Sequence, residues 1–334
     1  MKVVDISGYS FSGKSAIYDL LEEFDGYKSQ CKEFEFDLLR CPGGLLDLKN
    51  SLVEQWSPVR SSEAIRRFAR LVANLGGNGD VVARLTTLGT HYEKQFPGFA
   101  ELSRSYLETL CTAEWESSWP FAHFEAGKLE IFMRKILARL LKRDTMRAQV
   151  YLARPDAADF HHATCIYLRG LLSSHVYKGC RAVVLNNACE PFAPQNSLAL
   201  FDDAICIVVD RDPRDIYLSA LRTGLVGNAN VGRAVTGDSV DDFITRFCLY
   251  RCDDAPDHPR VLRLRFESLV ENYHTTVRHI QSFLGESEAV HVGKGVHFRP
   301  EVSARGVRQW LNATPSEREA VQRIEQKLPS YCDF

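Results

Sequence analysis

The feature that most constrains this chain is a glycine-rich turn close to its beginning. Gly8 to Ser15 reads GYSFSGKS and satisfies the P-loop pattern G-x-x-x-x-G-K-S. An apolar run at residues 2–7 predicts a strand before the turn, and the spacing over residues 15–24 predicts a helix after it. Inward-pointing backbone N–H groups, a helix N-terminus and the charge of Lys14 together favour an anion. The pattern predicts that a phosphate or sulfate group is bound by Ser10, Phe11, Ser12, Gly13, Lys14 and Ser15.

Further apolar runs indicate the fold class. Residues 181–185, 204–210 and 260–265 are β-branched or apolar, and each run is followed by a helical pattern. Such alternation is typical of parallel strands buried between helices. The sequence therefore predicts an α/β protein, a three-layer P-loop fold with a central parallel β-sheet.

A second strand is predicted at residues 31–38. Here apolar residues alternate with Glu33, Glu35 and Asp37. Because successive side chains of a strand point to opposite faces, we expect the three carboxylates on one side. The carboxyl ends of parallel strands are where ligands bind in such sheets, which makes these carboxylates candidates for a site.

The middle of the chain reads differently from its two ends. Residues 56–177 show helical spacing almost throughout, including the amphipathic segment KLEIFMRKILARLLKR. The sequence contains neither a Pro/Ser-rich linker nor a low-complexity tract that would divide it. We therefore expect a single domain, residues 1–334, with a large helical insertion at 41–180 that forms an acceptor-binding subdomain.

Composition and charge limit the possible binding partners and the cellular compartment of the protein. Charged residues make up 25% of the chain and the formal net charge is −2, so no overall field attracts nucleic acid or an anionic membrane. No apolar run reaches the roughly 18 residues of a membrane span, and the first residues lack the apolar core of a signal peptide. The ten cysteines are scattered and expected to be reduced. These features predict a cytoplasmic protein with no nucleic-acid partner and no membrane span.

A later segment carries a family resemblance. ICIVVDRDPRDIYLSAL reads as a buried strand, a turn and a helix, with Arg211 at the strand end and Ser219 eight residues later. The string RDPRDIYLS closely resembles the 3′-phosphate motif of sulfotransferases that use 3′-phosphoadenosine 5′-phosphosulfate (PAPS). Chemically, the guanidinium offers two parallel donors to a phosphate, and about two helical turns bring the Ser219 hydroxyl back beside it.

Two more segments are similar to this family and appear in the family's order. Residues 261–285 resemble its strand, turn and helix, and residues 302–321 resemble the loop that closes over the 3′-phosphate. The resemblance implies that Arg305, Gly306 and Arg308 bind that phosphate. It also implies PAPS as donor, 3′-phosphoadenosine 5′-phosphate (PAP) as product, and no metal.

The sequence departs from the family at two places. Lys14 stands three positions later than the lysine of many members, in the place that nucleotide kinases use. Asn186, Asn187 and Cys189 occupy the region where cytosolic members have a catalytic histidine. Carbohydrate and tyrosylprotein branches instead place a glutamate after the first helix. Sulfuryl transfer needs a base for the acceptor proton and a cation for the charge that builds on the leaving oxygen. Lys14 is the first candidate for the cation.

The base and the acceptor follow from the same analogy. Glu35 is the first candidate for the base, Glu33 the second, and Glu190 a third. The expected acceptor is a carbohydrate or another small metabolite. Two other interpretations stay open: a P-loop kinase that uses ATP and magnesium, with Asp210 beside the metal, and a nucleotide-binding module without catalysis. For Tyr217 and Trp310, packing is favoured over contact with adenine.

Overall fold

The structure, a computed structural model, describes residues 1–29, 34–77, 91–119, 121, 127–141, 147–226, 229–251 and 257–332. The chain divides into two compact units. Unit 1 comprises residues 1–36 and 175–334, and unit 2 comprises residues 37–174. Each unit is described by itself.

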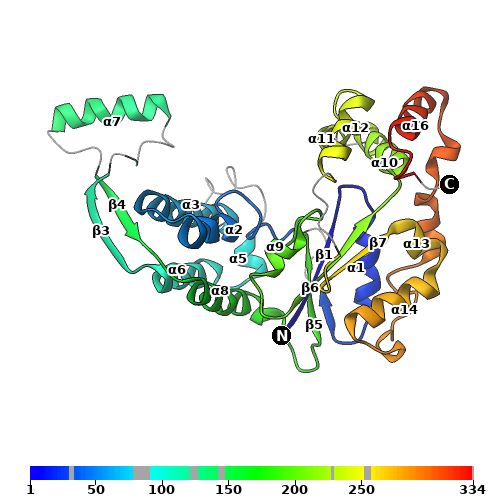
Figure 1. Cartoon of the computed structure of the whole chain (residues 1–334), viewed down its shortest axis with the longest axis horizontal. Helices are drawn as coiled ribbons and strands as arrows, with labels where there is room; N and C mark the ends of the chain where they lie inside the picture. Colours follow the sequence, from blue (N-terminus) through cyan, green and yellow to red (C-terminus); the bar gives the residue numbers. More distant parts are fainter. Residues whose placement is uncertain are drawn as a thin grey trace. The chain divides into compact units, whose positions relative to one another are not determined.

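Unit 1 is built on a five-stranded parallel sheet with the order β2-β5-β1-β6-β7 (Figure 1). The strands are β1 (Lys2–Gly8), β2 (Tyr27–Ser29), β5 (Ala182–Asn186), β6 (Ala204–Asp210) and β7 (Val261–Arg265). The three central strands are buried along almost their whole length, as expected for a parallel sheet covered on both faces. The predicted α/β class is confirmed, and so are the strands predicted at 2–7, 181–185, 204–210 and 260–265.

The helices of unit 1 form two apolar clusters, and the first of them includes residues of the sheet. Helices α1 (Lys14–Glu22), α13 (Phe266–Glu271) and α14 (Tyr273–Leu284) share one apolar cluster with alternate residues of β1, β6 and β7. Helices α10 (Pro213–Val226), α12 (Val240–Leu249) and α16 (Pro315–Lys327) form a second cluster. The remaining helical segments are α9 (Pro194–Leu198), α11 (Ala229–Thr236), α15 (Pro300–Ser303) and the 3₁₀ turns Glu288–Val290, Ala304–Gly306 and Gln309–Asn312.

Unit 2 is mostly helical. Its helices are α2 (Leu45–Lys49), which continues as a π-turn at Asn50–Glu54, α3 (Pro58–Gly76), α5 (Tyr92–Gln95), α6 (Phe99–Leu110), α7 (Lys128–Leu141) and α8 (Ala157–Leu172), followed by a 3₁₀ turn at Ser173–His175. Aromatic side chains join α3, α6 and α8: the rings of Tyr106 and Tyr167 stack at 4.6 Å, and Phe68 meets Tyr106 edge-on at 5.8 Å. Such pairs stabilise a core beyond their buried area.

A β-hairpin interrupts this unit, so the prediction of helix almost throughout was wrong. Strands β3 (Ala113–Ser118) and β4 (Arg147–Leu152) pair antiparallel, with Ala113 opposite Leu152. Most of β3 is exposed on both faces, so its sequence lacks the alternation that marks a half-buried strand. Its partner lies beyond α7 in the chain, and sequence periodicity does not record such distant pairing.

The strand predicted at 31–38 is also wrong in its described part. The second strand is Tyr27–Ser29, and residues 34–38 are irregular. The predicted alternation of burial is present, because Phe34, Phe36 and Leu38 are buried while Glu35 and Asp37 are partly exposed. The N–H of Phe36 donates to the carbonyl of Asn186 at 2.8 Å, a contact at the end of β5 that does not continue as a ladder. Glu33 lies outside the described residues.

Among the described residues no helix is both long enough and apolar enough to span a bilayer.

A buried carboxylate fastens the segment after α14 to the end of α1. Glu23 Oε2 lies 2.6 Å from His291 Nε2, and Oε1 accepts from the N–H groups of His297 at 2.8 Å and Phe298 at 2.7 Å. Burial raises the pKa of Glu23, but the hydrogen bonds to its carboxylate outweigh this effect and the pKa is lowered. The ionised form of Glu23 therefore stabilises the fold.

Replacing this carboxylate should cost stability in a pH-dependent way. Glu23→Gln is expected to lower the free energy of unfolding by about 2–3 kcal/mol at pH 7. Because the folded-state pKa is depressed, the contribution is complete above about pH 5 and is lost as the pH falls through the folded-state value. Urea denaturation of both proteins over a pH series measures the difference. Glu22→Gln, at the partly exposed neighbour, is the control, and a difference that stays constant down to low pH would contradict the assignment.

Candidate anion-binding site

The glycine turn between β1 and α1 has the curled backbone that its sequence predicts. Phe11 and Gly13 have positive φ values of 62° and 86°. A Cβ on Gly13 would lie 2.4 Å from Cδ2 of Phe266, and one on Gly8 would lie 2.6 Å from Oγ of Ser12. Both glycines of the motif are therefore required by close packing, and Gly13 by its left-handed conformation as well.

The turn also presents polar groups suited to an anion. The Oγ of Ser12 is buried and has no hydrogen-bond partner among the described residues. Helix α1 begins at Lys14, so its first N–H groups and the positive end of its dipole lie at the turn. Ser10 and Ser15 are exposed. These features fit a phosphate or sulfate group.

Lys14 and Glu35, two of the predicted residues, lie together. Lys14 Nζ is 2.9 Å from Glu35 Oε1, and Asn187 Nδ2 donates to the same oxygen at 2.8 Å. Asn187 adopts φ 55°, a left-handed conformation that asparagine tolerates better than most residues. The sequence indicated that Asn187 replaces a histidine, but nothing in it indicated that Asn187 would orient Glu35.

Asp5 holds the backbone that carries Asn187. Its two carboxylate oxygens accept from the N–H groups of Ala188 at 2.8 Å and Cys189 at 3.0 Å. Burial raises the pKa of Asp5 to about 6, although these two hydrogen bonds oppose the shift. Asp5 lies on β1 beside β5, so the sheet itself positions the turn after β5.

Arg211 joins the second predicted motif to the glycine turn. Its Nη1 donates to the carbonyl of Phe11 at 3.0 Å and to Oγ of Ser219 at 3.2 Å, and its Nη2 donates to the carbonyl of Gly306. The guanidinium carbon lies 5.1 Å from the ring centre of Phe266. The structure thus brings Phe11, Arg211, Ser219 and Gly306 together from three distant parts of the chain.

The guanidinium of Arg211 is buried near three carboxylates. Burial lowers the pKa of Arg211, and the nearby carboxylates of Asp215, Glu267 and Asp212 oppose this shift. Burial also raises the pKa of Asp215 to about 6. The hydrogen bonds of the guanidinium described above go to neutral oxygens, and its buried Nε has no partner among the described residues. Arginine stays charged at such sites, so a dianion would be stabilised here.

Of the three residues predicted in the C-terminal loop, the structure brings Gly306 into contact with Arg211. A Cβ on Gly306 would lie 3.2 Å from Phe266 Cε1, which explains the glycine. Arg305 is exposed, and Arg308 pairs with Glu271 rather than joining Arg211. Gln309, which sequence reasoning missed, donates to Oγ of Ser219 at 3.0 Å.

Tyr217 is buried and Trp310 is partly buried, and both pack against neighbouring side chains. The ring of Tyr217 meets that of Phe243 edge-on at 5.2 Å, and Arg214 lies 3.8 Å above the ring of Trp310.

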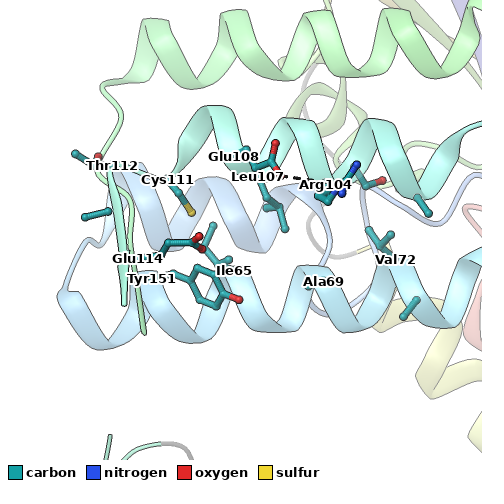
Figure 2. A pocket seen from close by; sticks show the side chains of 14 residues that line it. Ile65, Ala69, Val72, Arg104, Leu107, Glu108, Cys111, Thr112, Glu114 and Tyr151 are labelled. Carbon is teal, nitrogen blue, oxygen red and sulfur yellow. Dashed lines mark ion pairs between the residues drawn. The ribbon is translucent and has the colours of Figure 1, made fainter. Parts of the chain in front are cut away.

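Unit 2 contains a cavity of its own, of about 750 Å³. Figure 2 shows it between α3 and α6, with the start of β3 and Tyr151 of β4 at one end. The side chains that line it include Ile65, Val72 and Leu107, and Arg104 lies 3.9 Å from Glu108 at its edge. The lining is therefore mainly apolar with a charged rim, as in many small-molecule sites.

A comparison of the sequence with protein-family models and with curated proteins finds no match. Several solved structures are similar to the chain. The sulfotransferase domain of the Synechococcus PCC 7002 olefin synthase is 12% identical, covers 96% of this chain and 87% of its own, and gives a TM-score of 0.37. The sulfotransferase STF9 from Mycobacterium avium is 15% identical, with coverages of 100% and 77% and a TM-score of 0.37. Retinol dehydratase in complex with androsterone and the inactive cofactor PAP is 13% identical, with coverages of 100% and 83% and a TM-score of 0.35. At these values we base no functional conclusion on the likeness.

Proposed function

We propose that this chain is a PAPS-dependent sulfotransferase that moves a sulfuryl group from PAPS to an acceptor hydroxyl. The contact that carries the proposal is the hydrogen bond of Arg211 to Phe11, because it makes the glycine turn and the Arg211–Ser219 pair two parts of one site. PAPS carries anionic groups on both its 5′ and its 3′ side. A site with two adjacent anion-binding parts suits that donor.

The donor would lie with its 5′-phosphosulfate in the glycine turn and its 3′-phosphate at Arg211. Ser12 and the first N–H groups of α1 would bind the former. Ser219 and the guanidinium would bind the latter, exchanging neutral carbonyl partners for a charged one. Such an exchange strengthens each hydrogen bond of the arginine.

The kinase alternative finds less support at the end of β6. Its metal would need Asp210, but Arg251 donates to both oxygens of that carboxylate, at 2.6 and 3.1 Å, and the N–H of Arg211 donates to it at 2.8 Å. Arg251 is itself buried, stacked at 3.6 Å on the ring of Tyr9. Freeing Asp210 for magnesium would leave this arginine buried without its counter-charge.

The transfer itself needs a base and a cation. The acceptor oxygen attacks sulfur as the bond from sulfur to the bridging oxygen breaks; the proton passes to the base, and PAP leaves with the electron pair. Glu35 would accept the proton, held in place by Asn187. Lys14, beside it, would stabilise the charge that builds on the bridging oxygen. Glu33 stays a second candidate from the sequence.

We propose further that unit 2 selects the acceptor. This follows the expectation that residues 41–180 form an acceptor-binding subdomain, and the cavity between α3 and α6 supports it. Its mainly apolar lining favours a hydroxylated apolar metabolite over a glycan, because sugar hydroxyls would be buried there without partners.

The first test asks whether Arg211 binds the 3′-phosphate of PAP, by comparing PAP with AMP. The unmodified protein should bind PAP at least about tenfold more tightly than AMP, which lacks the 3′-phosphate. Arg211→Met should lower the affinity for PAP to that for AMP and leave the affinity for AMP unchanged. Isothermal titration calorimetry measures all four values. Arg181→Met, at a half-exposed ion pair, is the control, and equal binding of PAP and AMP, or binding of ATP with magnesium only, would refute the donor assignment.

The second test concerns the base. Glu35→Gln should reduce turnover at least about 100-fold with any acceptor found in a panel of phenols, alcohols and sugars. Affinity for PAP should not fall, because Glu35 has the same sign of charge as the nucleotide and competes with it for Lys14. Asp37→Asn, two residues further on and paired with Arg40 at 2.7 Å, is the matched control. Full turnover in Glu35→Gln would remove Glu35 from the mechanism.

The third test fills the cavity of unit 2. Ala69→Trp and Ala73→Trp place a large side chain on the lining of α3. Each should raise the KM for the acceptor by about tenfold or more while leaving PAP affinity unchanged. Asn74→Trp, at an exposed position of the same helix outside the lining, is the control. An unchanged KM in both cavity variants would place the acceptor elsewhere.

A further inference from the structure

Helix α7 exposes an apolar surface that the described residues of unit 2 do not cover. It lies in the chain between the strands β3 and β4, and Figure 1 shows it at the end of that hairpin. Its large apolar side chains have high exposed fractions: Leu129 74%, Phe132 59%, Met133 49%, Leu137 47% and Leu140 74%. An exposed cluster of this kind usually marks a contact surface.

These side chains lie along one face of the helix. Positions 129, 132, 133, 136, 137 and 140 recur at intervals of three and four, which places them on one side of a helix with 3.6 residues per turn. We call this set the apolar stripe of α7.

Basic residues border the stripe. Lys128, Lys135 and Arg139 are exposed and recur at intervals of seven and four, so they form a row along one edge. Residues 128–143 contain six Lys and Arg and a single Glu. Although the whole chain has a net charge of −2, the region around α7 is strongly positive.

We propose that α7 binds the surface of an anionic lipid bilayer. The apolar stripe would lie among the acyl chains near the headgroups, and the basic row would contact lipid phosphates. The helix, of 14 residues, is about 21 Å long, shorter than the roughly 30 Å of a bilayer core, so it lies along the surface and does not cross.

Charge favours a lipid surface over a second copy of this chain. Two α7 helices packed stripe to stripe would bring two positively charged segments together, because residues 128–143 contain six Lys and Arg and a single acidic residue. Like charges at such a contact oppose association. An anionic surface instead supplies the complementary charge along the whole row, and its attraction should weaken with salt.

Vesicle flotation of the full chain tests this proposal. The protein should float with vesicles of phosphatidylcholine containing about 30% phosphatidylglycerol, and far less with phosphatidylcholine alone or at high salt. The double variant Phe132→Glu with Leu140→Glu, and the double variant Lys135→Glu with Arg139→Glu, should each lower the partition coefficient about tenfold or more.

Matched controls separate the helix from general changes of surface. Ile166→Glu alters an apolar side chain of α8 that is 54% exposed, and Lys94→Glu with Lys178→Glu makes the same change of charge at exposed lysines that are not part of α7. Both should float like the unmodified protein. All variants should bind PAP, or whatever nucleotide the unmodified protein binds, with unchanged affinity, so the result does not depend on the proposed function.

Two outcomes would overturn the proposal. One is flotation that does not depend on lipid charge, or that is unchanged in both α7 double variants. The other is a dimer, detected by light scattering, that the Phe132→Glu and Leu140→Glu variant converts to monomer while the unmodified protein does not float. That result would assign the apolar stripe to a second copy of the chain.

Discussion

The hydrogen bond from Arg211 to the carbonyl of Phe11 connects residues 200 positions apart, and the candidate site depends on it. It is possible because β1 and β6 are parallel neighbours, with Gly8 opposite Val209. Both strands therefore end at the same edge of the sheet, where one continues into the glycine turn and the other into Arg211. Close packing of Gly13 and Gly306 on Phe266 then holds the turn and the C-terminal loop beside the guanidinium.

The parts of this site that the sequence predicted are those encoded over short distances. The glycines and Lys14 follow from the local pattern of a strand, a turn and a helix, and Ser219 lies two helical turns after the strand end. The contacts of Asn187 with Glu35 and of Gln309 with Ser219 were missed, because they join segments with no shared periodicity. The hairpin of unit 2 was missed for the same reason: β3 is exposed and pairs with a strand beyond the next helix.

The two units carry different physical chemistry. In unit 1 the candidate site is charged: Arg211 is buried with Asp215 close to it, and the partly exposed Lys14 is paired with Glu35. In unit 2 the notable features are apolar: a cavity lined by α3 and α6, and the exposed stripe of α7. Charged side chains fit recognition of an anionic donor, whereas apolar surfaces fit a metabolite acceptor and a lipid surface.

A crystal structure of the chain with PAP tests the central claim most directly. The account predicts the 5′-phosphate in the turn between β1 and α1, within hydrogen-bond distance of Lys14, and the 3′-phosphate within that distance of Arg211 and Ser219. A nucleotide bound elsewhere, or a guanidinium of Arg211 that faces away from both phosphates, would contradict it.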